Sequence, residues 1–229
     1  MNDRQKERKI DIVMCIDATS SMGPCIDNVR ANAKTLYSQF VDKMKTEYNS
    51  VVEELRLQIV TFRDLECDVN AIVKSEWFEL PTDNARFQRC LDAISARGGG
   101  DYKESGLEAF FTAMNTDWSA KGQDDRQVIV LFTDADAIDF DEKKNRTGYE
   151  TMCNADLFYS TWLCMRGNLN KMTERGKRGV FFAPADTVYS NLVKTMNRTI
   201  HYAVVPQNGM ADVKFDDIIK MLCSSASSH

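Results

Sequence analysis

The stretch Lys9–Gly23, KIDIVMCIDATSSMG, decides the fold of this chain. Its nearly continuous apolar run over 10–16 is typical of a strand that is buried on both faces of a parallel sheet. The run ends at Asp17, and the hydroxyl residues Thr19 and Ser21 follow at alternate positions. The sequence therefore predicts an acid and two hydroxyls at the carboxyl end of a buried strand.

A long helix is predicted directly after this strand. Pro24 stands where a first helical turn tolerates proline. Beyond it, apolar residues recur at steps of three and four, namely Ile26, Val29, Ala33, Leu36 and Phe40. We expect this helix to extend to about Tyr48.

Ligands of open α/β sheets bind in the crevice at the carboxyl ends of the strands. Hard oxygen donors placed there favour Mg²⁺ or a related cation.

Strand and helix patterns alternate along the rest of the chain. Further strands are predicted over 55–62, 69–78, 128–132, 180–183 and 200–205, and further helices over 83–94, 104–114, 156–175, 186–196 and 215–222. The short spacing between 55–62 and 69–78 allows an antiparallel hairpin at the sheet edge. We therefore expect an α/β fold with a doubly wound, mostly parallel central sheet and one antiparallel edge strand.

The chain of 229 residues has the length of one large α/β domain. Residues 9–223 are predicted to form a single domain, because no internal repeat or linker interrupts them. The polar segments 1–8 and 224–229 are expected to be a disordered N-terminus and a disordered tail.

Composition excludes several classes of function. The formal net charge of −5 disfavours nucleic-acid binding, which requires a basic face, and no apolar run is long enough to span a bilayer. The first nine residues, MNDRQKERK, lack the apolar core of a secretion signal. The seven cysteines form no CxxC pair, which is typical of free thiols in a reducing compartment, and we expect a cytoplasmic protein. With only two histidines, a Ser-His-Asp or Cys-His catalytic apparatus is disfavoured.

Two further loops contain oxygen ligands. Three consecutive glycines precede Asp101, and they predict a tight loop because glycine permits positive φ. The second strongly apolar strand ends on Thr133 and Asp134. The acidic loop 136–142 that follows is interpreted as a solvated surface beside the site, where a partner contact is also plausible.

At this point the sequence resembles the von Willebrand factor A (vWA) domain family. The segment 17–21 matches the D-x-[ST]-x-S motif that opens the metal-ion-dependent adhesion site of that family. The resemblance implies that Thr19 and Ser21 bind the metal directly. It also implies that Asp17 and Asp134 act through water or as outer partners.

The second loop departs from the common family pattern, which has a threonine there. Here the sequence is GGGDxxE, with Asp101 followed by Glu104, a form similar to that of a subset of intracellular vWA proteins. Asp101 is expected to tighten cation binding and to weaken recruitment of an acidic ligand. The predicted metal residues are thus Asp17, Thr19, Ser21, Asp101 and Asp134, with Mg²⁺ the expected cation and Mn²⁺ or Ca²⁺ as alternatives.

The resemblance implies an intracellular, non-enzymatic module that binds another protein within a multi-protein assembly with an ATPase, kinase or phosphatase. One alternative is that Asp17, Thr19 and Ser21 only cap the following helix. Another is a magnesium-dependent phosphohydrolase with Asp17 as nucleophile and Lys103 steadying the phosphoryl group. The haloacid-dehalogenase-like pattern would place a second carboxylate at position 19, where this chain has threonine. No GxxxxGK[ST] motif is present, which excludes a P-loop.

Overall fold

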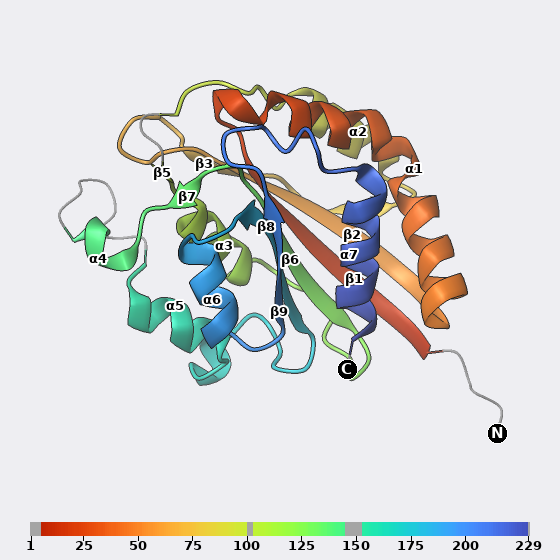
Figure 1. Cartoon of the computed structure of the whole chain (residues 1–229). Helices are drawn as coiled ribbons and strands as arrows, with labels where there is room; N and C mark the ends of the chain where they lie inside the picture. Colours follow the sequence, from red (N-terminus) through yellow and green to blue (C-terminus); the bar gives the residue numbers. More distant parts are fainter. Residues whose placement is uncertain (1–5, 100–102, 145–152, 229) are drawn as a thin grey trace.

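A twisted sheet with helices on both faces forms the centre of the protein in a computed structural model, which describes residues 6–99, 103–144 and 153–228 (Figure 1). The strand order is β3-β2-β1-β6-β8-β9. Five neighbouring strands are parallel: β2 (Ser50–Phe62), β1 (Lys6–Asp17), β6 (Arg126–Phe132), β8 (Lys177–Pro184) and β9 (Thr199–Val204). The predicted doubly wound, mostly parallel α/β fold is confirmed.

The antiparallel edge consists of two short strands on β2. β3 (Ile72–Lys74) and β4 (Phe78–Leu80) pair with successive parts of β2, so the single edge strand expected over 69–78 is divided. The division falls at Ser75, whose N–H donates to the carbonyl of Ile59 and whose hydroxyl accepts from the N–H of Ile59. The edge position itself is occupied as predicted.

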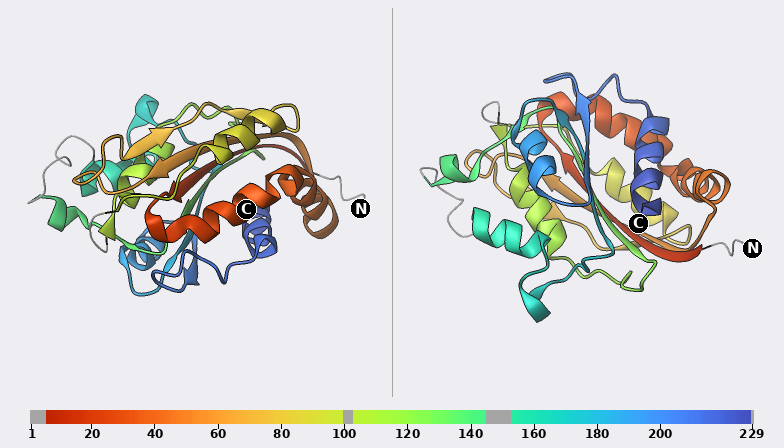
Figure 2. Two further views of the ribbon diagram at one scale, coloured as in Figure 1. Left: turned by 90° about the horizontal axis from the view of Figure 1, so that it is seen from above. Right: turned by 60° about the horizontal axis from the view of Figure 1, so that its bottom comes forward.

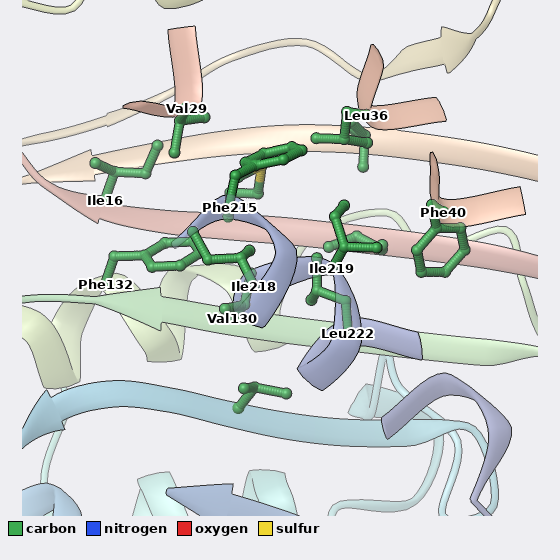
Figure 3. Close-up of a cluster of buried hydrophobic side chains, with 14 of the residues drawn as sticks. Ile16, Val29, Leu36, Phe40, Val130, Phe132, Phe215, Ile218, Ile219 and Leu222 are labelled. Atoms are coloured by element: carbon green, nitrogen blue, oxygen red, sulfur yellow. The ribbon is translucent and has the colours of Figure 1, made fainter. Parts of the chain in front are cut away.

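One face of the sheet is covered by α1 (Gly23–Tyr48), α2 (Asn84–Asp92) and α7 (Phe215–Ser227). Figure 3 shows side chains of α1 and α7 meeting those of β1 and β6, among them Val29, Phe40, Ile219 and Val130. Each such fully buried side chain contributes about 1.5–3 kcal/mol. This apolar packing fixes the start of α1 directly beyond the end of β1.

The opposite face is covered by α3 (Gly106–Met114), α5 (Ala155–Trp162) and α6 (Val188–Thr195). Aromatic contacts dominate this layer, for example the stacking of Phe110 on Phe181 with centroids 4.9 Å apart. A two-stranded sheet, β5 (Lys103–Glu104) with β7 (Asp136–Ala137), and the short helix α4 (Phe140–Lys143) lie beside it. No helix in the described ranges is long and apolar enough to cross a membrane.

Regular structure extends further toward both ends of the chain than expected. β1 begins at Lys6 and α7 ends at Ser227, so the expectation of disorder over 1–8 and 224–229 is wrong for residues 6–8 and 224–227. Guanidinium groups hold the end of α7: Arg8 donates to the carbonyl of Ala226, and both Arg126 and Arg178 donate to the carbonyl of Ser228. These three buried arginines come from the amino ends of β1, β6 and β8.

The helix predicted over 156–175 is wrong beyond Trp162. α5 ends there, and a 3₁₀ turn, η2 (Gly167–Leu169), follows. Cys164 and Gly167 both have positive φ, which breaks the helical path. Apolar residues of this segment are exposed, Met165 by 72%.

Candidate metal centre

Asp17, at the last position of β1, is the innermost residue of the predicted site. Its side chain is completely buried. One carboxylate oxygen, Oδ1, accepts hydrogen bonds from the N–H of Thr19 at 2.9 Å and from its hydroxyl at 2.7 Å. The other, Oδ2, accepts from the hydroxyl of Thr133 at 2.7 Å. The carboxylate is therefore held in one orientation by two neighbouring strand ends.

The environment of Asp17 opposes its ionisation. Burial raises the pKa of Asp17 to about 6, and the nearby charge of Asp134 acts in the same direction. The hydrogen bonds from Thr19 and Thr133 lower the pKa but do not cancel the effect of burial. A cation bound beside Asp17 would favour the ionised form.

A second hydroxyl–carboxylate pair joins the β1–α1 loop to the end of β6. Ser21 lies in the 3₁₀ turn η1 (Ser20–Met22), and its hydroxyl donates to Oδ1 of Asp134 at 2.9 Å. Oδ2 of Asp134 accepts from the N–H of Gly209 at 2.7 Å, and its carbonyl accepts from the N–H of Gln207. The loop after β9 thus closes over the site, and Figure 1 shows it (blue) beside the start of α1 (red).

Tight packing at Gly209 makes this closure possible. Gly209 has a φ of +56°, and a Cβ there would lie 2.1 Å from the carbonyl oxygen of Ser21. Only glycine fits this backbone conformation and this approach.

The glycine-rich loop is tied to the same place. The N–H of Arg97 donates to the carbonyl of Ala18, and the hydroxyl of Ser20 donates to the carbonyl of Gly98. A Cβ on Gly99 would lie 3.1 Å from both Oε1 of Glu104 and Cγ2 of Thr19, so this loop passes between the two side chains. The structure therefore places the buried carboxyl of Glu104 next to the site. Asp101 lies outside the described residues.

The arrangement fits a divalent cation. The hydroxyls of Thr19 and Ser21 each donate their proton to a carboxylate, which leaves the oxygen lone pairs available to a metal. In the described ranges, hydroxyl and backbone N–H groups are the partners of both carboxylates, and no lysine or arginine pairs with either. Because buried charges are normally paired or bound to metal, an external cation is the natural counter-charge.

Two of the four oxygen groups at this site are hydroxyls, and two are carboxylates. Within the described ranges, no three histidine, cysteine or acidic side chains are grouped to hold a metal. The helix-capping alternative is not supported, because α1 starts after Met22 with no side-chain cap.

Two residues that position the site were not among those predicted for it. Thr133 holds Asp17, and the hydroxyl before Asp134 was the available signal in the sequence. Gly209 holds Asp134, and the Asn-Gly pair at 208–209 indicated only a turn.

The acidic loop 136–142 makes specific contacts. Asp136 accepts a hydrogen bond from the N–H of Val188 at the start of α6, and Glu142 forms an ion pair with Lys103. The adjacent Lys143 pairs with Glu108 of α3, and both side chains are buried. Asp136 therefore has a specific structural contact, whereas Asp139, Asp141 and Glu142 are exposed, as the interpretation of a solvated surface predicts.

Solved structures share this fold at low sequence identity. Proximal thread matrix protein 1 from the mussel byssus aligns over 94% of this chain and 46% of its own, with a TM-score of 0.51 and 14% identity. The open conformation of the pilus adhesin SpaC from Lactobacillus rhamnosus GG aligns over 96% of this chain and 30% of its own, with a TM-score of 0.51 and 10% identity. This chain therefore spans less than half the length of either protein, and at such identity the likeness concerns the fold alone.

Sequence comparison gives the family. No curated protein matches the chain significantly. The family profile described as von Willebrand factor A domain matches residues 11–195, which include the carboxyl half of β1, the glycine-rich loop and the end of β6. The chain belongs to the von Willebrand factor A domain family.

Proposed function

We propose that this chain is a divalent-cation-dependent module that binds another protein. The family to which it belongs consists generally of protein-interaction modules, which supports the coarser part of this proposal. The cation would be held by the hydroxyls of Thr19 and Ser21, with Asp17 and Asp134 as partners of those hydroxyls. Bound Mg²⁺ would supply a positive charge that attracts an oxygen ligand of the partner.

One observation carries the proposal. Two hydroxyls, separated by one residue, each donate to a different carboxylate, and neither carboxylate has a cationic partner in the described ranges. Asp101, which we also propose as a metal residue, would add a third carboxylate. We further propose a cytoplasmic location and a partner within a multi-protein assembly containing an ATPase, kinase or phosphatase, on the basis of the sequence resemblance and composition.

The geometry does not favour the phosphohydrolase alternative. Both carboxylate oxygens of Asp17 accept hydrogen bonds from hydroxyls, and the side chain is completely buried, whereas a nucleophile needs an accessible oxygen. Lys103, offered as the phosphoryl-binding residue, pairs with Glu142.

Cation binding is tested by thermal unfolding of the full chain with Mg²⁺, Mn²⁺ or Ca²⁺ and with a chelator. A cation that binds the native state raises the midpoint of unfolding, and about 2.7 kcal/mol is expected at a hundredfold excess over Kd. Ser21→Ala should abolish the shift. Ser20→Ala is the matched control, because that exposed hydroxyl donates only to the carbonyl of Gly98. The proposal would be contradicted if the cation shifted the unfolding midpoint equally in Ser21→Ala and Ser20→Ala, or did not shift it in the wild type.

A further inference from the structure

An apolar hollow lies at the β2–β3 edge of the sheet, on the face covered by α1, α2 and α7. Its volume is about 270 Å³. The floor is formed by Ile59, Thr61 and Val73, which share one face because Thr61 pairs with Val73 across β2 and β3. The wall is formed by Cys90 and Ile94, at the carboxyl end of α2. α2, which packs beside α1 and contacts β4, is the yellow-green helix in Figure 2.

A second hollow continues the first along α2. It has a volume of about 440 Å³, and its lining includes Phe78, Arg86 and Arg89. Ser75 and Cys90 line both hollows, so the two form one groove. We call it the α2 groove.

The rim of the α2 groove is basic. Arg63 and Arg97 border the first hollow, and Arg86 and Arg89 border the second, whereas Glu76 is the one acid in the two linings. Glu76 is already paired with Arg86. The side chains of Arg89 and Arg97 have no hydrogen bond or ion pair in the described ranges, and both are exposed. This basic rim occurs in a chain whose formal net charge is −5.

One end of the groove adjoins the candidate metal centre. Nε of Arg63 and the N–H of Arg97 both donate to the carbonyl of Ala18, each at 3.0 Å. Ala18 lies between Asp17 and Thr19. A chain segment seated in the groove would therefore pass beside the loop that carries the proposed cation.

We propose that the α2 groove binds an extended acidic peptide segment of the partner protein, with an apolar side chain in the hollow and carboxylates against Arg97 and Arg89. The apolar floor selects the anchoring side chain, and the basic rim selects the flanking charge. This inference rests on the proposed protein-binding function and names the chemistry of the partner.

The test uses the full chain as bait for a phage-displayed library of random short peptides. Selected sequences are expected to combine a large apolar residue with several acids. The best peptide, labelled with fluorescein, is then titrated by anisotropy against Arg97→Glu and Ala93→Trp, where Ala93 lines the first hollow. We expect at least about tenfold weaker binding in each, because one variant repels the acids and the other fills the hollow. Arg175→Glu is the matched control, since this exposed arginine is not among the residues that line the groove.

Ser21→Ala distinguishes failure of this inference from failure of the metal proposal. Peptides that bind Arg97→Glu and Ala93→Trp as tightly as the wild type would overturn the proposal for the α2 groove. If Ser21→Ala did not bind those same peptides, the metal proposal would still stand. A library that yields no binder, or a basic consensus, would also overturn the proposal for the α2 groove. Weaker peptide binding by Arg97→Glu and Ala93→Trp, with unchanged binding by Arg175→Glu, supports the proposal for the α2 groove. This holds whether or not cations shift the midpoint of thermal unfolding.

Discussion

The hydroxyl of Ser21 donates to Asp134 at 2.9 Å, across 113 positions of sequence. This contact joins the β1–α1 loop to the end of β6, while Asp17 is joined to the same strand end through Thr133. The two carboxylates therefore share a rigid frame, and disturbing one part of it should be measurable in the others.

Thr133→Val should destabilise the protein by about 1–3 kcal/mol, because it leaves Oδ2 of the buried Asp17 without its hydroxyl donor. The two side chains have nearly the same shape, so little cavity is created. Urea unfolding with chelator present measures the effect. Thr133→Ser, which keeps the hydroxyl, should retain most of the stability, and equal losses in both variants would show that the hydrogen bond is not the cause.

Gly209→Ala should be more damaging than Gly167→Ala, although the two glycines have nearly equal φ, +56° and +54°. Both substitutions incur backbone strain of about 1–2 kcal/mol. Only at Gly209 would the new Cβ collide with the carbonyl of Ser21, whereas nothing lies within 4 Å at Gly167. An additional loss of about 1–3 kcal/mol is expected there. The free energies of unfolding of the two variants, compared directly, decide the matter.

The metal-free protein should become less stable as the pH rises through about 6. The pKa of Asp17 is raised to about 6 by burial, from an ordinary value of 3.8, so protonated Asp17 favours the folded state. That contribution, about 3 kcal/mol, is fully present below pH 3.8 and is lost as the pH rises through 6. The measurement is the difference in stability between wild type and Asp17→Asn from pH 4 to 8 with chelator. A difference that does not vary with pH would contradict this assignment.

Lys143→Met should cost about 3–5 kcal/mol, because it leaves the completely buried Glu108 without its cation. Burial already raises the pKa of Glu108, and Lys143 is the main influence that lowers it. The double variant Glu108→Gln with Lys143→Met should recover much of the loss. Chemical unfolding of the wild type, both single variants and the double variant gives the coupling energy. Additive losses would show that the two residues do not act as a pair.

The central strands and the β1–α1 loop could be predicted from the sequence because their information is local. The apolar run over 10–16 indicates a strand buried on both faces, and Asp17, Thr19 and Ser21 follow within five residues. The ends of the sheet were not predicted, because Arg8, Arg126 and Arg178 are charged and yet buried. Their burial depends on carbonyls at the end of α7, which no local pattern announces.

The rest of the candidate site depends on tertiary contacts. Thr133 and Gly209 take their roles from the positions of β1 and the loop after β9. The error over 156–175 has a related origin, because Met165 and Leu169 are four residues apart, as on one face of a helix, but both are exposed. Spacing identifies an apolar stripe, but the tertiary structure decides whether anything covers it.

The hydrogen bond from Gly209 to Asp134 also has a consequence for biosynthesis. A nascent chain that has left the ribosome only as far as α6 already contains Asp17, Thr19, Ser21 and Asp134, but it lacks the amide that orients Asp134. A domain generally folds as a unit during synthesis, so its early segments wait for the later ones. The orientation of Asp134 by this amide is thus deferred until translation has passed Gly209.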